Sequence, residues 1–240
     1  MTKHIGIVAC SAEGAALCFR EIAAYAQQFM GEHQHPQVTL SCIAMGEWMP
    51  AFNRADYAAV ADFMVRETEI VAKAGAHFAI CPDNSAHLAF PQVIARSPIP
   101  WLHIAEEAAK AAVRDGRKHA ALLGTRFTMT GWVYPQIFER YGIAITPPSL
   151  EDQQLVDRII FQELVNGVLK DASRLAYNEV IARLEAQGCD CVILGCTEIP
   201  LLIRADDCPL PTLDSTRLLA RASVDAALGR VDLPLRPSGQ

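Results

Sequence analysis

The stretch Gly188-Cys-Asp-Cys-Val-Ile-Leu-Gly-Cys-Thr-Glu198 passes from a glycine, through a short apolar run, to a polar end. The stretch Gly75-Ala-His-Phe-Ala-Ile-Cys-Pro-Asp-Asn-Ser-Ala86 has the same plan in an earlier part of the chain. Asp83 and Cys196 lie at the same distance from the glycine of their stretch. A short apolar run with a polar end is typical of a buried strand that runs into a loop.

A second pair of segments repeats in nearly the same register. The strand end Val8-Ala-Cys-Ser11 corresponds to Leu123-Gly-Thr-Arg126. The two recurring segments predict duplicated half-units, each of which delivers two polar strand ends to one edge of a sheet.

Short apolar runs alternate with longer amphipathic stretches along the whole chain. The strands we expect are Ile5–Ala9, Val38–Ile43, Phe78–Cys81, Trp101–His103, Ala120–Leu123, Ile143–Thr146, Cys191–Leu194 and Leu210–Leu213. The helices we expect are Gly14–Gln28, Asp56–Ala74, Glu106–Asp115, Tyr134–Tyr141, Gln154–Leu169, Leu175–Gln187 and Thr216–Leu228. This alternation indicates strand–helix–strand units with parallel strands.

The predicted fold is therefore α/β, with two pseudo-symmetric lobes that each have a central parallel sheet flanked by helices. We expect residues 1–103 plus 208–240 to form lobe 1, and residues 104–207 to form lobe 2. Ligands of open α/β sheets bind outside the carboxyl ends of the strands. The active site is thus expected in the cleft between the lobes, with Asp83 and Cys196 on its two sides.

Composition narrows the classes of function. The net charge of −6 and the scattered Lys and Arg residues argue against a nucleic-acid partner or an anionic membrane. No stretch approaches the roughly 18 apolar residues that would cross a bilayer, and the first residues do not form a signal peptide. The eight cysteines are then expected to be thiols in a reducing cytoplasm. The tail 231–240 is expected to be poorly ordered.

Motifs for cofactors are weak. Cys189-x-Cys191 has no second ligand pair of the kind that a zinc site needs, so we expect no metal. Neither of the glycine-rich motifs that bind nucleotides occurs, so we expect no nucleotide cofactor.

Cys196 is the strongest candidate for chemistry. It follows a strand and a glycine, and it is expected to open a helix, whose N-terminus would stabilise a thiolate. Gly195 would let the backbone approach a ligand closely. Most of the other cysteines are interpreted as buried small hydrophobic residues.

Four motifs together resemble the aspartate/glutamate racemase superfamily. Leu194-Gly-Cys-Thr-Glu198 is similar to the LGCTE signature of its second catalytic cysteine, and Pro82-Asp-Asn-Ser-Ala-His87 is similar to its first signature, PCNTAH. Gly124-Thr-Arg-Phe-Thr-Met129 resembles GTxxTM, and Asp214-Ser-Thr216 resembles the closing DTT-like motif. The motifs occur in order and cover nearly the whole chain.

The resemblance implies an isomerase that works without pyridoxal phosphate, as a dimer, on the α-carbon of an amino acid or a related carboxylate. One group removes the α-proton, and another protonates the opposite face. Cys196 and Asp83 would be these groups, and Glu198 would orient a side chain or bind the substrate ammonium group. The residues that would bind the substrate are Asn84, Ser85, Thr125, Thr128, Thr197, Glu198 and Ser11, with Lys170 as a cationic partner or merely a solvated helix-end lysine. His87 would lie behind the site.

Asp83 stands where the superfamily has its first catalytic cysteine. An ordinary aspartate pKa near 3.9, against about 8.5 for cysteine, makes it a weaker base by roughly 6 kcal/mol of proton affinity. Asp83 could be a base tuned by burial, or it could bind the substrate ammonium group. The substrate could also need only one proton donor, as in a one-thiol decarboxylase or a cis–trans isomerase. Cys81 is a less suitable substitute, because it would lie along the body of the strand.

The segment from Cys42 to Phe52 lacks the Arg or Gln that acidic-substrate members of the superfamily carry there. It has Trp48, Met49 and Phe52 instead. These residues form either an apolar covering loop or a pocket for a less acidic or bulkier substrate. A non-catalytic amino-acid-binding protein is the remaining alternative.

Overall fold

The computed structural model describes residues 2–233 and divides the chain into two compact units. Unit 1 comprises Met1–Ile104 and Thr216–Gln240, and unit 2 comprises Ala105–Ser215. Residues 234–240, most of the tail expected to be poorly ordered, lie outside the described residues. Among residues 2–233, no helix is long and apolar enough to cross a membrane.

Unit 1 is built on a parallel sheet of three strands in the order β2-β1-β3. The strands are β1 (Ile5–Ala9), β2 (Val38–Cys42) and β3 (Phe78–Ile80). The helices of this unit are α1 (Ala12–Met30), α2 (Met45–Asn53), α3 (Tyr57–Lys73), the 3₁₀ helix η1 (Asn84–Ala89), α4 (Phe90–Ile94) and α11 (Ser215–Ala227, whose first residue belongs to unit 2).

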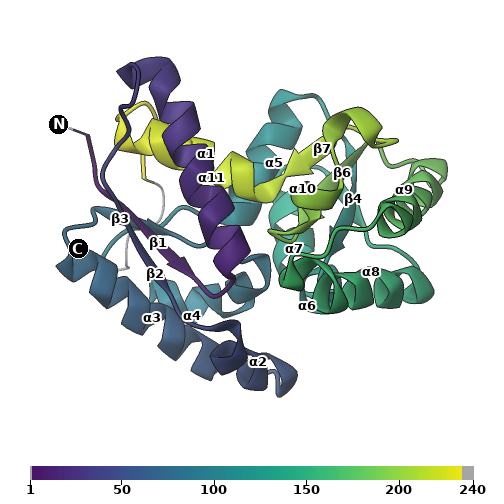
Figure 1. Ribbon diagram of the computed structural model, residues 1–240, viewed down its shortest axis with the longest axis horizontal. Coiled ribbons are helices and arrows are strands. Elements are labelled where there is room, and N and C mark those ends of the chain that lie inside the picture. Colours follow the sequence, from purple (N-terminus) through teal and green to yellow (C-terminus); the bar gives the residue numbers. More distant parts are fainter. Residues whose placement is uncertain (1, 234–240) are drawn as a thin grey trace. The chain divides into compact units, whose positions relative to one another are not determined.

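Both faces of this sheet are buried, and successive side chains of β1 point to opposite faces. Ile5, Ile7 and Ala9 pack in one core with residues of α1 and α11. On the opposite face, a Cβ at Gly6 would lie 2.7 Å from Val71 Cγ2 of α3. Figure 1 shows α1 and α11 on one side of the sheet and α3 on the other. The apolar runs of the sequence therefore reflect burial on both sides.

Unit 2 has a parallel sheet of four strands in the order β5-β4-β6-β7. The strands are β4 (His119–Gly124), β5 (Ala144–Thr146), β6 (Cys191–Gly195) and β7 (Thr212–Asp214). The helices are α5 (Ile104–Arg114, whose first residue belongs to unit 1), α6 (Arg126–Thr130), α7 (Val133–Arg140), α8 (Leu150–Gln162), η2 (Leu164–Asn166), α9 (Asp171–Ala186), α10 (Ile199–Leu202) and η3 (Ala205–Asp207). Ala121 and Leu123 of β4 share a core with residues of α8 and α9, and Figure 1 shows α5 on the other side of these strands.

The predicted α/β class with parallel sheets and flanking helices is confirmed, and three details need correction. Trp101–His103 is not a strand, because Trp101 makes only an isolated bridge to Ala79. The segment Cys42 to Phe52 is largely helical, since α2 occupies most of it. Residues 208–215 belong to unit 2 rather than lobe 1, because Val192 of β6 pairs with Thr212 of β7.

Two facing glycines let β4 and β6 approach closely at their carboxyl ends. Gly124 pairs with Gly195, and a Cβ on Gly195 would lie 2.7 Å from the main-chain oxygen of Leu123. A Cβ on Gly124 would lie equally close, 2.7 Å, to the main-chain oxygen of Gly195. Neither contact can relax by rotating a side chain, because backbone atoms are involved.

We therefore expect Gly195→Ala to lower the free energy of unfolding by about 1–3 kcal/mol, the usual cost of overpacking. Urea titration followed by circular dichroism measures this change. Gly46→Ala is the matched control, since a Cβ at Gly46 meets nothing within 4 Å. Equal stability of Gly195→Ala and the wild type would contradict the close packing of these strands.

Candidate active site

Cys196 immediately follows β6, whose five residues are all buried. Its thiol donates a hydrogen bond to Glu198 Oε2 at 3.0 Å, and the Thr197 hydroxyl donates to the same oxygen at 2.7 Å. All three side chains are buried. The turn after β6 thus places a carboxylate directly against the thiol.

This geometry corrects the expected role of a helix N-terminus. Cys196 does not open a helix: α10 begins at Ile199 and has four residues. Thr197 lies in the turn between β6 and α10. The group that contacts the thiol is instead the Glu198 carboxylate, which accepts a hydrogen bond from it and so fixes its orientation.

Asp83 lies just beyond β3, after Cys81 and Pro82, at the position that precedes η1. Its Oδ2 atom accepts a hydrogen bond of 2.8 Å from the main-chain N–H of Cys10, the residue after β1. The Cys81 thiol lies 3.9 Å from the same oxygen and 3.8 Å from the Asp83 carbonyl oxygen. The carboxylate is therefore held against the end of the neighbouring strand.

Cys10 and Cys81 are poor candidates for the missing base. Burial, and next the negative charge of Asp83, raise the pKa of both thiols well above the ordinary value for cysteine. A thiol with a raised pKa stays protonated near neutral pH and acts as a hydrogen-bond donor rather than a base. The raised pKa agrees with the interpretation of Cys81 as a less suitable substitute.

The other predicted binding residues of unit 1 lie beside Asp83 or at the end of β1. Asn84 is buried and begins η1, and Ser85 follows it, half-buried. Ser11 precedes α1, and its hydroxyl accepts a hydrogen bond of 3.2 Å from the Gly14 N–H. Ser11 thus has a structural role as a helix cap, and Asn84 opens a short 3₁₀ helix rather than an α-helix.

In unit 2, Thr125 caps a helix as Ser11 does in unit 1. It caps α6, and its hydroxyl accepts a hydrogen bond of 3.4 Å from the Thr128 N–H. Thr128 is buried, and Thr125 is half-buried. Within each unit the predicted residues therefore follow the carboxyl ends of two adjacent strands, β1 and β3 in one, and β4 and β6 in the other.

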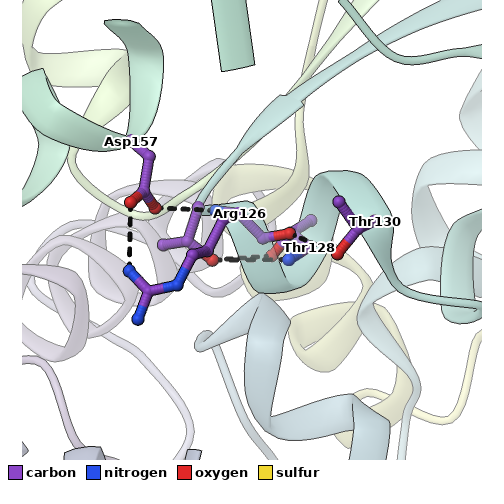
Figure 2. A network of polar contacts seen from close by, with 5 residues as sticks. Arg126, Thr128, Thr130 and Asp157 are labelled. Atoms are coloured by element: carbon purple, nitrogen blue, oxygen red, sulfur yellow. Dashed lines mark hydrogen bonds and ion pairs between the residues drawn. The ribbon is translucent and has the colours of Figure 1, made fainter. Parts of the chain in front are cut away.

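The Thr125–Thr128 turn is fixed by a residue that the sequence did not indicate. Asp157 of α8 accepts a hydrogen bond of 2.7 Å from the Arg126 main-chain N–H. The second carboxylate oxygen lies 3.1 Å from the Arg126 guanidinium. Figure 2 shows this carboxylate beside both groups, with Thr128 and Thr130 on the following turn. Nothing in the local sequence marks Asp157, because its partner lies in a different element.

Lys170 does not have the character of a substrate-binding cation. It is exposed at the start of α9, and its ammonium group pairs with Glu163 at 3.1 Å. The hydrogen bond from Ser173 and the ion pair with Lys170 lower the pKa of Glu163, so this carboxylate remains charged. The interpretation of Lys170 as a solvated helix-end lysine agrees with this position.

Trp48 and Phe52 form part of the core of unit 1. The Trp48 ring stacks on Phe52 and Phe63, with centroids 6.2 Å and 5.9 Å apart, and Trp48 is fully buried. These contacts favour the interpretation of the segment as an apolar cover. The indole N–H of Trp48 has no hydrogen-bond partner among the described residues.

His87 connects the Asp83 turn to the start of α5. Its Nδ1 atom lies 3.2 Å from the Asp83 carbonyl oxygen, and its Nε2 atom lies 3.5 Å from the Ile104 N–H. A neutral ring with the proton on Nδ1 satisfies both contacts. Complete burial lowers the pKa of His87 to about 4, so the ring is neutral near neutral pH.

This pKa predicts a loss of stability in mild acid. The pKa of His87 is lower in the folded protein than the ordinary 6.5, so the unfolded chain binds more protons between these values. The contribution of His87 to the free energy of unfolding is intact above about pH 6.5, and we expect it to fall by about 2 kcal/mol between pH 7 and pH 5.

Urea unfolding at both pH values measures the effect. In His87→Asn the amide can still donate to the Asp83 carbonyl but does not titrate, so its stability should depend less on pH. The same pH dependence in this variant and the wild type would contradict a neutral His87.

The described residues contain no group of three or more His, Cys, Asp and Glu side chains that could hold a metal ion.

Comparison with known proteins gives consistent matches. The family described as Asp/Glu/hydantoin racemase matches residues 5–223 of the chain. The broad specificity amino-acid racemase RacX of Bacillus subtilis is 24% identical over 163 residues, which are 65% of this chain and 67% of RacX.

Two solved structures are similar over almost their whole length. A candidate Asp/Glu racemase from Yersinia pestis is 32% identical with a TM-score of 0.85, and covers 94% of this chain and 99% of its own. An aspartate racemase homologue from Pyrococcus horikoshii is 26% identical with a TM-score of 0.81, and covers 95% of this chain and 100% of its own.

Proposed function

Because this chain belongs to the Asp/Glu/hydantoin racemase family, we propose that it is an amino-acid racemase or epimerase with Cys196 and Asp83 as its acid–base pair. The observation that carries the proposal is the contact between the buried Cys196 thiol and the Glu198 carboxylate. Asp83 supports it, since it follows β3 as Cys196 follows β6. The reaction needs no cofactor in this proposal.

In one direction, the proton of the Cys196 thiol first passes to Glu198, which leaves a thiolate. The thiolate removes the α-proton, and the electron pair of the broken C–H bond remains on the substrate as a carbanion. Protonated Asp83 then delivers its proton to the opposite face of the same carbon. In the reverse direction the Asp83 carboxylate removes the α-proton, the Cys196 thiol gives its proton to the opposite face, and Glu198 returns the proton that it holds to the thiolate.

We propose that neutral polar side chains at the strand ends bind the carboxylate and ammonium groups of the substrate. These residues are Asn84, Ser85, Thr125, Thr128 and Thr197, together with Ser11 near the end of β1. Glu198 already accepts hydrogen bonds from Cys196 and Thr197, which favours a role for Glu198 in orienting the thiol over binding the substrate ammonium group. The ion pair of Lys170 with Glu163 makes Lys170 a weak candidate for a substrate side-chain carboxylate. An amino acid less acidic than aspartate fits these neutral residues.

The test is a panel of L- and D-amino acids incubated with the enzyme in deuterated water. NMR detects deuterium at the α-carbon, and chiral chromatography detects inversion. Folded protein that exchanges and inverts none of them would overturn the proposal. Stabilisation against heat by an amino acid, without exchange, would favour a non-catalytic binding protein.

A one-thiol decarboxylase or cis–trans isomerase is a second candidate, favoured by one observation. The Asp83 carboxylate accepts the Cys10 N–H, and such a donor stabilises the charged form and weakens the base. Cys196 would then act alone. Release of carbon dioxide from a malonate-type acid, or isomerisation of maleate, would identify this activity.

We also propose a homodimer, which the family resemblance implies, and a cytoplasmic location, which suits eight cysteines that are all free in the structure. Light scattering coupled to size exclusion measures the first, and cell fractionation measures the second.

A further inference from the structure

Two buried thiols, those of Cys10 and Cys81, lie beside the side chain of Asp83. Cys10, Cys42 and Cys81 end or directly follow the strands β1, β2 and β3, which are neighbours in the sheet. The Cys81 thiol lies 3.9 Å from Asp83 Oδ2. The Cys10 thiol also hydrogen-bonds the Asp83 side chain, in addition to the 2.8 Å hydrogen bond from its N–H.

The Cys10 and Cys81 thiols lie within hydrogen-bonding distance of a carboxylate that the proposed reaction uses as an acid and a base, and the single proton of the Cys81 thiol is shared between this carboxylate at 3.9 Å and the Asp83 carbonyl oxygen at 3.8 Å. A donor stabilises the charged carboxylate and so lowers its affinity for a proton. A thiol is a weaker donor than a hydroxyl, and its contact is longer. Thiol donors therefore position a carboxylate while they reduce its basicity less than hydroxyl groups would.

We propose that Cys81, together with Cys10, is a positioning residue that sets the proton affinity of Asp83. This inference rests on the proposed function, in which Asp83 exchanges a proton with the substrate. Neither thiol touches the substrate in this proposal, and both act through the carboxylate.

The remaining titratable groups around Asp83 do not replace these donors. The Cys42 thiol is exposed and lies at the end of β2. Partial burial, and next the negative charges of Asp83 and of Glu67 on α3, raise the pKa of this thiol. His87 contacts the carbonyl oxygen of Asp83 rather than its carboxylate. The Glu67 carboxylate accepts hydrogen bonds from Ser41 and Arg66.

The test compares two substitutions of the same side chain, one that keeps a hydrogen-bond donor and one that removes it. In Cys81→Ser, a hydroxyl donates a stronger hydrogen bond to the carboxylate, so we expect the pKa of Asp83 to fall by about 0.5–1 unit. In Cys81→Ala the donor is lost, so we expect this pKa to rise by a similar amount. A merely structural perturbation has no reason to act in opposite directions in the two variants.

The pKa of Asp83 is read directly from protein labelled with carboxyl-¹³C aspartate, in which the Asp83 resonance is identified by its loss in Asp83→Asn. For the direction of the reaction in which Asp83 is the base, the acid limb of the pH profile for α-proton exchange should move with this pKa. Cys10→Ser and Cys10→Ala form a second pair, which keeps the Cys10 N–H. Cys189→Ser is the control, because this buried thiol lies before β6, where it hydrogen-bonds Thr146 and is near the charge of Asp190.

Opposite shifts of the carboxyl pKa in the Ser and Ala variants support the proposal. Shifts in the same direction, or shifts under about 0.2 unit in both pairs, overturn it. If the wild type exchanges no α-proton, the proposed function fails, while the carboxyl titration still decides whether the thiols set the proton affinity of Asp83. If the titration shifts and the acid limb of an active enzyme does not follow, the role of Asp83 as the base is overturned.

Discussion

Cys196→Ala is expected to reduce racemisation by at least about 10³-fold, because it removes a group that directly takes and gives the proton. The effect should appear in kcat for both enantiomers, since each direction of racemisation uses Cys196 once. Chiral chromatography measures the loss of inversion, and NMR measures the loss of deuterium uptake by the enantiomer whose α-proton faces Cys196. The variant should fold normally, because the substitution removes a single sulfur atom from a residue that is 8% exposed.

Glu198→Gln is the matched control for this prediction. The amide keeps the size of the side chain and can still accept a hydrogen bond from the thiol, but it cannot take the thiol proton. We expect a loss of about 10–100-fold, smaller than that of Cys196→Ala. Full activity in Cys196→Ala would contradict the assigned role of the thiol, and an unchanged rate in Glu198→Gln would contradict only the proton transfer to Glu198.

Asp83→Asn is expected to abolish inversion while it leaves exchange of one enantiomer. The amide can neither take nor give the proton, so racemisation should fall by about 10²–10⁴-fold. Cys196 still removes and returns a proton on its own face, so the enantiomer with its α-proton on that side should take up deuterium without inversion. Separate incubations of L- and D-substrate in deuterated water, analysed by NMR and chiral chromatography, distinguish the two outcomes.

The stability of the Asp83 variants separates this effect from damage to the fold. The amide oxygen of Asp83→Asn can still accept the 2.8 Å hydrogen bond from Cys10, whereas Asp83→Ala leaves that N–H without its acceptor. We expect Asp83→Ala to be less stable than Asp83→Asn by about 1–3 kcal/mol. Racemisation at the wild-type rate in Asp83→Asn would show that Asp83 is not an acid or base, and would favour the one-thiol alternative.

The strands could be predicted because their signal is local. Ile5–Ala9 is an unbroken apolar run, and the structure makes β1 of the same residues. The helix α2 was missed for an equally local reason: Pro50 interrupts a short segment whose buried residues, Trp48, Ala51 and Phe52, resemble an irregular cover. The helix expected at Cys196 was wrong because a turn of three residues separates the strand from α10.

The sequence by itself determined the α/β class, the repeat of polar strand ends, and the positions of Asp83 and Cys196 after β3 and β6. Burial and periodicity decide these features, and both act over a few neighbouring residues. Only the tertiary structure decided that β7 pairs with β6, that the Cys10 N–H and the Cys81 thiol hold Asp83, and that Asp157 fixes the Thr125 turn. Apart from Cys81, which lies close to Asp83 in sequence, these partners are distant along the chain or carried by the backbone, so no local pattern of side chains records them.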